Sequence, residues 1–377
     1  MQTKLIYKNR NLFILLFTAL SVLFSGYKYD NQTSSFIELK NERLPVTPKE
    51  FYIAGVTDAR KNNAIIGNLA PAATLGNNNG DAVNIELKGG ITAIKNLIDY
   101  SLPANKKLRP VIIKLKTLKV TESPLAGGRV SGQVTLSVSF GLQQDDDIVH
   151  LTDYTGSASY QRAAGPAQQI EPLLRSTITN SLIYLNNWMN AQAGNNIKLA
   201  KSVEIKFSDY YEPAEGDTIY YNTNRPLKWT DFQQKPQRGS NHGAEIFASL
   251  GYNEQVELIN GVIYIKLDLK VFAPKSACWV RGDVGDAYSL NHEQRHFDIV
   301  KLVAEHFKKA IQAEKLSTTN YDGPINVAFF DALREIDKLQ KQYDGETRHS
   351  INTYEQQLWN NKIDKELQEL GVKNATI

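Results

Sequence analysis

Two histidines and a glutamate lie close together in the segment SLNHEQRHFDIVKLVAEHF, which begins at Ser289. On a helix, residues four apart are separated by about 40° around the axis, so His292 and His296 point to one side, one turn apart. Two imidazoles at this spacing can hold one Zn²⁺, and a catalytic zinc keeps a position open for water. Glu293 lies about 100° from His292, where it can act as general base. The HExxH spacing predicts a zinc centre that hydrolyses peptide bonds with a zinc-activated water.

A catalytic zinc needs a third protein ligand, and the downstream segment YDGETRHS contains two candidates. Glu346 and His349 are three residues apart and share a face on a helical turn. One of them would bind the metal while the other orients it from behind. We take His349 as the third ligand and Glu346 as the alternative ligand or the supporting residue. Both could instead do no more than cap a helix.

Other polar residues near these motifs receive simpler interpretations. Asp298 lies about 200° from His296 around the helix, so we expect it to form hydrogen bonds in the helix packing and not to bind metal. His242 could line the cleft but is expected on the surface, and so is His306. Tyr343 adjoins the second motif and is a candidate for stabilising an oxyanion.

Three helices and a hairpin must position these residues. Apolar periodicity predicts helices over about 287–315, 325–343 and from 347 or 350 to 370, with a break at Gly345. The segment VELINGVIYIKLDLKVF predicts a hairpin, because the dipeptide Asn260-Gly261 tolerates the positive φ of a tight turn. We expect its sheet to place an edge strand above the metal-binding helix, where an extended substrate could add. The last helix is expected to bury the following residues: Ile351, Tyr354, Leu358 and Leu367.

The first half of the chain predicts an α+β domain without a chemical site. The segment VSGQVTLSVSF alternates as a strand, and IEPLLRSTITNSLIYLNNWM carries one apolar helical stripe. We therefore assign residues 48–205 to an α+β accessory domain that packs or docks. Residues 206–377 are assigned to a zincin-like metallopeptidase domain, so the whole chain is predicted to be α+β.

The N-terminus has the pattern of an export signal. Lys4, Lys8 and Arg10 precede the apolar run NLFILLFTALSVLFSG, which is short for a membrane span of about 20 residues. We expect residues 1–26 to be a signal peptide or an N-terminal anchor, and 27–47 to be a linker. No other segment is apolar enough to span a bilayer. The protein is predicted to be exported, to the periplasm or beyond the cell.

The composition of the chain excludes several classes of binding partner and site. The net charge of +3 is mild and no basic stripe is interleaved with aromatic residues, so no nucleic-acid partner is expected. The single cysteine, Cys278, excludes an internal disulfide and any multi-cysteine metal site. The expected partner is a protein or peptide substrate.

Several motifs together resemble one bacterial family. NHEQRHFDI and YDGETRHS, with LKWTDFQQKP, SNHGAEI and FAPKSACWV before them, are similar to domain of unknown function 922, described as predicted secreted zinc-dependent proteases. The resemblance covers about residues 219–370. It implies metal ligands at His292 and His296 and a base at Glu293, and it directs attention to Glu346 and His349. That family often has glycine after the last histidine, where this chain has a serine.

The sequence therefore predicts an exported zinc metallopeptidase. A zinc-bearing envelope protein that binds a partner without cutting it is the first alternative. A metal-free adaptor whose helix matches the motif by chance is the second.

Overall fold

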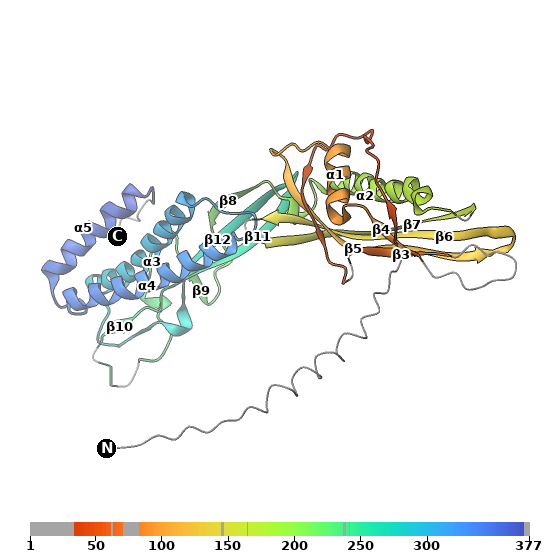
Figure 1. Cartoon of the computed structure of the whole chain (residues 1–377). Coiled ribbons are helices and arrows are strands. Elements are labelled where there is room, and N and C mark those ends of the chain that lie inside the picture. The colour runs from red at the N-terminus through yellow and green to blue at the C-terminus, as the bar shows by residue number, and fades with distance from the viewer. Residues whose placement is uncertain are drawn as a thin grey trace, which may run out of the picture. The chain divides into compact units, whose positions relative to one another are not determined.

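The computed structural model describes residues 34–372, except 62, 71–82, 145–146, 164, 237–238 and 241. The chain contains both helices and sheets and is α+β, as predicted. It divides into two compact units, Met1–Trp188 and Met189–Ile377 (Figure 1). The predicted export signal lies outside the described residues. Within the part of the chain that is described, no helix is both long and apolar enough to cross a membrane.

The first unit is built on a sheet of seven strands among the described residues, with the order β1-β4-β3-β5-β6-β7 and β2 paired to β5. β1 lies in the segment expected to be a linker, yet it pairs in parallel with β4. Tyr184 of α2 donates to or accepts from Thr152 of β7 at 2.9 Å, which places this helix against the sheet. The elements are β1 Ser34–Ile37, β2 Phe51–Asp58, β3 Ile65–Leu69, β4 Val83–Leu87, α1 Gly90–Ser101, β5 Arg109–Leu125, β6 Arg129–Gln144, β7 Asp147–Ala163 and α2 Glu171–Gln192.

The second unit contains a sheet with the order β11-β12-β8, in which β9 also pairs with β12. The predicted hairpin is confirmed: β11 and β12 are antiparallel, and Asn260 and Gly261 have φ values of 52° and 80°. β8 spans the expected domain boundary at 205/206 and pairs in parallel with β12, so this strand belongs to the second unit. The strands are β8 Ser202–Asp209, β9 Thr218–Tyr220, β10 Ala244–Glu245, β11 Ser249–Ile259, β12 Val262–Pro274 and β13 Trp279–Val280.

Three helices follow the sheet: α3 Ala287–Ala313, α4 Asp322–Thr347 and α5 Thr353–Glu369. α3 begins at the Asp286 N-cap, whose side chain accepts from the Ser289 N–H at 2.8 Å. One side of α3 packs into the core with the sheet, and the other forms a second core with α4 and α5. The first group includes Phe297, Val300, Val303 and Phe307, and the second includes Ile299, Leu302, Tyr343, Trp359 and Ile363. α3 is therefore held on both sides, which fixes the direction of its polar residues.

Two details of the helices differ from the prediction. α4 continues through Gly345, where a break was expected, and ends at Arg348, whose N–H bonds to the Asp344 carbonyl. The residues predicted to face inward on α5 are exposed at Ile351, Tyr354 and Leu358, although Leu367 is buried. The buried face of α5 is Gln356, Trp359, Ile363 and Leu367. The prediction chose the inner face of α5 from its apolar residues alone. Gln356, which is polar, is buried on the true inner face.

Candidate metal centre

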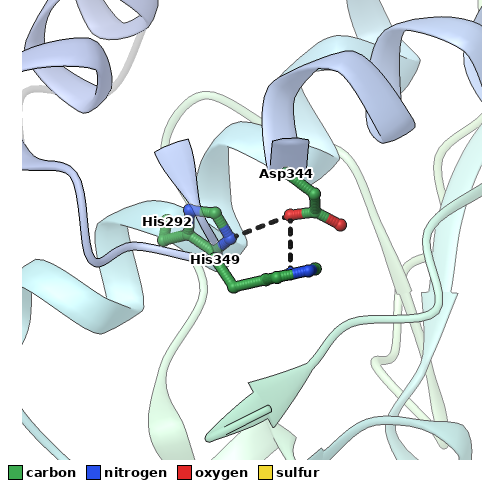
Figure 2. A group of neighbouring side chains, drawn as sticks. All are labelled: His292, Asp344 and His349. Atoms are coloured by element: carbon green, nitrogen blue, oxygen red, sulfur yellow. Dashed lines mark hydrogen bonds and ion pairs between the residues drawn. The ribbon is translucent and has the colours of Figure 1, made fainter. Parts of the chain in front are cut away.

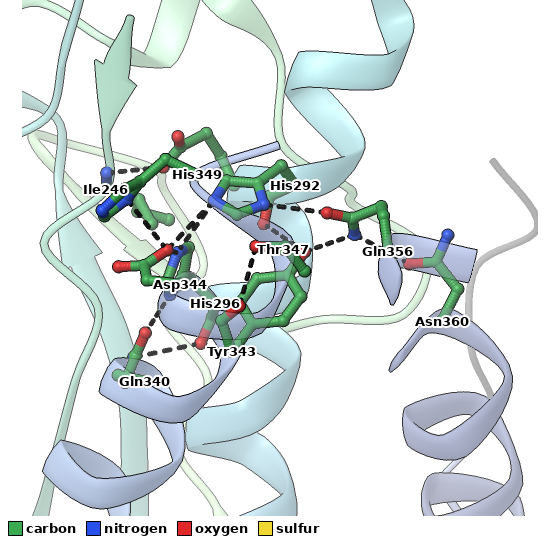
Figure 3. Close-up of polar contacts among 11 residues, drawn as sticks. Ile246, His292, His296, Gln340, Tyr343, Asp344, Thr347, His349, Gln356 and Asn360 are labelled. Atoms are coloured by element: carbon green, nitrogen blue, oxygen red, sulfur yellow. Dashed lines mark hydrogen bonds and ion pairs between the residues drawn. The ribbon is translucent and has the colours of Figure 1, made fainter. Parts of the chain in front are cut away.

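α3 presents His292 and His296 on one side, one turn apart, as predicted. Their Nε2 atoms are 3.3 Å apart, and both side chains are buried. Because both imidazoles are buried, their nitrogens form hydrogen bonds within the protein. Apart from each other, their hydrogen-bond partners are side chains of α4 and α5. The arrangement of these side chains is shown in Figure 3.

α4 adds a carboxylate that the sequence interpretation did not select. Asp344 Oδ1 lies 3.2 Å from His292 Nε2 and 2.9 Å from His296 Nε2. The signal for it lay in helical spacing: Gln340 and Asp344 are four apart and share a face if the helix continues past Tyr343. The predicted end of this helix at residue 343 hid the relation.

The three donor atoms fit a single zinc ion. Donors about 2.0–2.1 Å from a tetrahedral zinc are about 3.3 Å from one another. The separations between the His292 Nε2, His296 Nε2 and Asp344 Oδ1 atoms are 3.3, 3.2 and 2.9 Å. Two imidazole nitrogens and one carboxylate oxygen are also a donor set that zinc accepts.

Glutamines hold both imidazoles from behind. His292 Nδ1 lies 2.9 Å from Gln356 Oε1, and His296 Nδ1 bonds to Gln340 Oε1. The Gln356 amide nitrogen donates to the Tyr343 hydroxyl and, at 3.1 Å, to Asn360 Oδ1, so its oxygen is the atom left for the imidazole. Each Nδ1 therefore carries a proton and donates to its glutamine, which leaves each Nε2 directed at Asp344. Such outer partners fix the tautomer of metal-binding histidines.

Tyr343 supports this arrangement and does not face the substrate side. Its ring is fully buried and stacks on His292, with centroids 4.7 Å apart, and its hydroxyl donates to the His292 carbonyl at 3.4 Å. Burial raises the pKa of Tyr343. The ring does not line the cavity beside the centre, so the predicted oxyanion role is wrong.

His349 joins the centre from the turn after α4. Its Nδ1 is 3.3 Å from Asp344 Oδ1, and ligand atoms of His292, Asp344 and His349 all lie within 4.8 Å of one another (Figure 2). The turn has positive φ at three successive residues, with 49° at Arg348, 49° at His349 and 67° at Ser350. The His349 side chain is 42% exposed, so it lies at the open side of the centre.

His242 and Glu346 are placed differently from the predictions. The ring of His242 stacks on His349 with centroids 3.9 Å apart and lines the cavity, where a surface position was expected. Glu346 accepts from Trp359 Nε1 at 2.6 Å and from Gln342 Nε2 at 2.8 Å, and it does not line the cavity. Its carboxylate thus joins α4 to α5 and is not directed at the histidines.

Glu293 lies in the wall of the centre, next to His292 in sequence. Its Oε2 accepts from the Ile246 N–H at 2.9 Å, and only 5% of the residue is exposed. Burial raises the pKa of this carboxyl, although the charges of His296 and His292 act in the opposite direction. A raised pKa makes the carboxylate a stronger proton acceptor, which suits a general base.

Burial and mutual contact also shift the other groups of the centre. Burial acts to raise the pKa of Asp344, but hydrogen bonds from His292 and His296 outweigh it and hold this pKa well below its usual range. Burial acts to lower the pKa of His296, yet the bond to Asp344 raises it overall. In the protein without metal, His296 and Asp344 therefore stabilise each other's charged forms.

Asp298 and His306 lie outside the centre. Asp298 is buried and accepts from Arg295, Gln294 and Tyr221 at 2.9, 2.9 and 3.1 Å, which is the structural role expected of it. His306 was expected on the surface; its side chain is 38% exposed and pairs with Glu335 at 2.8 Å.

A cavity of about 480 Å³ opens onto the centre. Glu293, His292, His296, Asp344 and His349 all reach it. The remaining wall comes from α4, from Val284 and Ser289, and from the chain around β10; the last of these contributes His242, Gly243, Ala244, Glu245, Ile246, Phe247 and Ala248. The residues of β11 do not line the cavity, so the edge strand expected above the centre is replaced by the segment that contains β10.

Comparison with known proteins adds two weak structural similarities. No family model and no curated protein matches the sequence. A crystal structure of a Xanthomonas campestris protein described as DUF330 aligns with 43% of this chain and 99% of its own, at 9% identity and a TM-score of 0.29. A minor lipoprotein from Acinetobacter baumannii aligns with 26% of this chain and 75% of its own, at 15% identity and a TM-score of 0.18. Similarities at this level carry no argument about function.

Proposed function

We propose that the second unit is a zinc-dependent metallopeptidase, with His292, His296 and Asp344 as ligands and Glu293 as general base. The observation that carries the proposal is the set of three donor atoms 2.9–3.3 Å apart beside a buried glutamate in an accessible cavity. The resemblance of the two motifs to domain of unknown function 922 supports it. The basic and apolar N-terminus supports action outside the cytoplasm.

Asp344, and not His349, is the third ligand in this proposal. Asp344 Oδ1 contacts both helix histidines, whereas His349 Nδ1 contacts Asp344 itself at 3.3 Å. The half-exposed ring of His349 stands on the open side, where it can donate a hydrogen bond to a substrate carbonyl. His242 stacks against that ring and limits its rotation.

The residues of the cavity divide the chemistry between them. A bound Zn²⁺ would act as a Lewis acid and lower the pKa of a water ligand to about 7. Glu293 takes a proton from the attacking water and passes it to the leaving nitrogen of the peptide bond. The Ile246 N–H holds the Glu293 carboxylate in place for both transfers.

The segment around β10 is the expected binding site for an extended peptide. β10 pairs with β13 through Ala244 and Glu245, and the following residues continue along the cavity wall. A peptide that adds beside this segment gains backbone hydrogen bonds, and its side chains point alternately to the two walls.

Metal content and turnover together test the proposal. The purified protein should bind one equivalent of zinc, and Glu293→Gln should keep the zinc while cleavage of a peptide library falls by about 10²-fold or more. Protein that binds no zinc, or cleavage unchanged in Glu293→Gln, would overturn it. Zinc bound without any chelator-sensitive cleavage would favour the alternative, a zinc-bearing envelope protein that binds a partner.

A further inference from the structure

The wall that α4 contributes to the cavity changes from polar to apolar along the helix. Leu333, Ile336, Gln340 and Asp344 all line the cavity and are three or four residues apart, so they follow one face. Gln340 and Asp344 both contact His296, as Figure 3 shows. Ile336 lies one turn before Gln340, about 6 Å along the helix axis. An apolar surface therefore begins directly beside the centre.

A second segment of the cavity wall contains apolar residues as well. Ile246, Phe247 and Ala248 line the cavity from the segment after β10. Phe247 is 60% exposed and lines the cavity together with its neighbours Ile246 and Ala248. A contiguous apolar surface left in water is typical of a binding site.

The remaining carboxylates of the cavity wall are paired with neighbours. Glu245 accepts from Trp279 Nε1 at 2.9 Å, and Asp337 pairs with Lys341 at 2.7 Å. The apolar part of the wall is separate from these carboxylates and is formed by Phe247, Leu333 and Ile336.

We infer that, if the proposed peptidase function holds, the substrate is a polypeptide with an apolar side chain next to the bond that is cut. Phe247, Leu333 and Ile336 form the subsite that receives this side chain. Residues of an extended peptide are about 3.3 Å apart, and alternate side chains on one face about 6.6 Å. The repeat of about 6.6 Å is close to the length of about 6 Å between Gln340 and Ile336 along the helix axis. A substrate residue within two positions of the cleaved bond therefore reaches the subsite.

The inference is tested with fluorescein-labelled hexapeptides that differ only by leucine or asparagine at each of four central positions. Binding to zinc-loaded Glu293→Gln protein is measured by anisotropy, and cleavage is measured with the unaltered protein. At one position, leucine should bind at least about tenfold more tightly than asparagine. Phe247→Ala should reduce this ratio several-fold. Phe330→Ala is the matched control, because Phe330 is 58% exposed but does not line the cavity.

The outcomes separate the subsite from the proposed function. Equal binding of the leucine and asparagine peptides at every position overturns the subsite, as does an equal effect of Phe247→Ala and Phe330→Ala. If the unaltered protein cuts none of the peptides while the leucine preference in binding persists, the subsite stands and the peptidase function fails. Leu333→Ala, on α4, provides a second variant of the subsite, should Phe247→Ala disturb folding.

Discussion

Asp344 Oδ1 lies within 3.3 Å of a nitrogen atom of each of three histidines, His292, His296 and His349. We predict that Asp344→Ala weakens zinc binding by more than about 100-fold, since loss of even an outer partner of a metal ligand costs about 10- to 100-fold. Glu346→Ala should leave the zinc affinity within a few-fold, because Glu346 bonds to Trp359 and Gln342. Competition with a chromophoric chelator measures both. A larger loss in Glu346→Ala than in Asp344→Ala would contradict the assignment.

Ser350 adopts a backbone conformation that suits glycine, with φ of 67°. The left-handed region costs a residue with a Cβ atom about 1–2 kcal/mol. Glycine avoids this cost but loses about 0.5–1 kcal/mol more backbone entropy on folding. Ser350→Gly should therefore raise the free energy of unfolding by about 0.5–1 kcal/mol in urea titrations. Ser159→Gly in β7 is the control and should lower it, since an extended strand gains nothing from glycine.

His306 provides a pH dependence that is separate from the centre. The hydrogen bond to Glu335 raises the pKa of His306 above 6.5, against the opposing effect of burial. Because the folded pKa is the higher one, this contribution to stability is complete below pH 6.5 and is lost as pH rises through the folded pKa. Both side chains are 38% exposed, so the contribution is small, about 0.5 kcal/mol or less. The difference in unfolding free energy between the unaltered protein and Glu335→Gln should therefore shrink as pH rises above 6.5. A difference that grows with pH would contradict the prediction.

At the scale of elements, α5 positions a histidine of α3 through one buried glutamine. Gln356→Ala removes the acceptor of His292 Nδ1 and should lower zinc affinity by about 10- to 100-fold. Gln357→Ala is the matched control on the same helix, since Gln357 is exposed and bonds only to Asn361 at 2.9 Å among the hydrogen bonds of the described residues. Chelator competition compares the two variants, and equal affinities would show that α5 does not orient His292.

Some elements could be predicted closely from the sequence and others could not. α3 and the β11–β12 hairpin carry strong local signals, a side-chain cap at Asp286 and the Asn260-Gly261 turn. The end of α4 was mispredicted because glycine disfavours a helix by only about 1 kcal/mol. Full burial of Tyr343 and Thr347, on either side of Gly345, outweighs that preference. Local propensity decides an element only where packing does not oppose it.

At the scale of the whole molecule, every residue of the centre belongs to the unit Met189–Ile377. We predict two transitions in calorimetry, of which zinc shifts one. At a hundredfold excess over the dissociation constant, zinc stabilises its unit by about 2.7 kcal/mol, or about 5–10 °C for a unit of this size. His292→Ala should abolish the shift and leave the other transition in place. A single transition that moves as a whole with zinc would contradict independent unfolding.

The sequence by itself determined the α+β class, the helix that bears His292, Glu293 and His296, and the hairpin beside it. These follow from periods of two and of three to four residues, which act within one element. Only the tertiary structure decided that Asp344 approaches both histidines, that Gln340 and Gln356 hold them from behind, and that Glu346 turns away to Trp359. Those contacts join three helices, and the approach of one helix to another depends on how all their buried side chains pack. A spacing within one helix cannot contain that information.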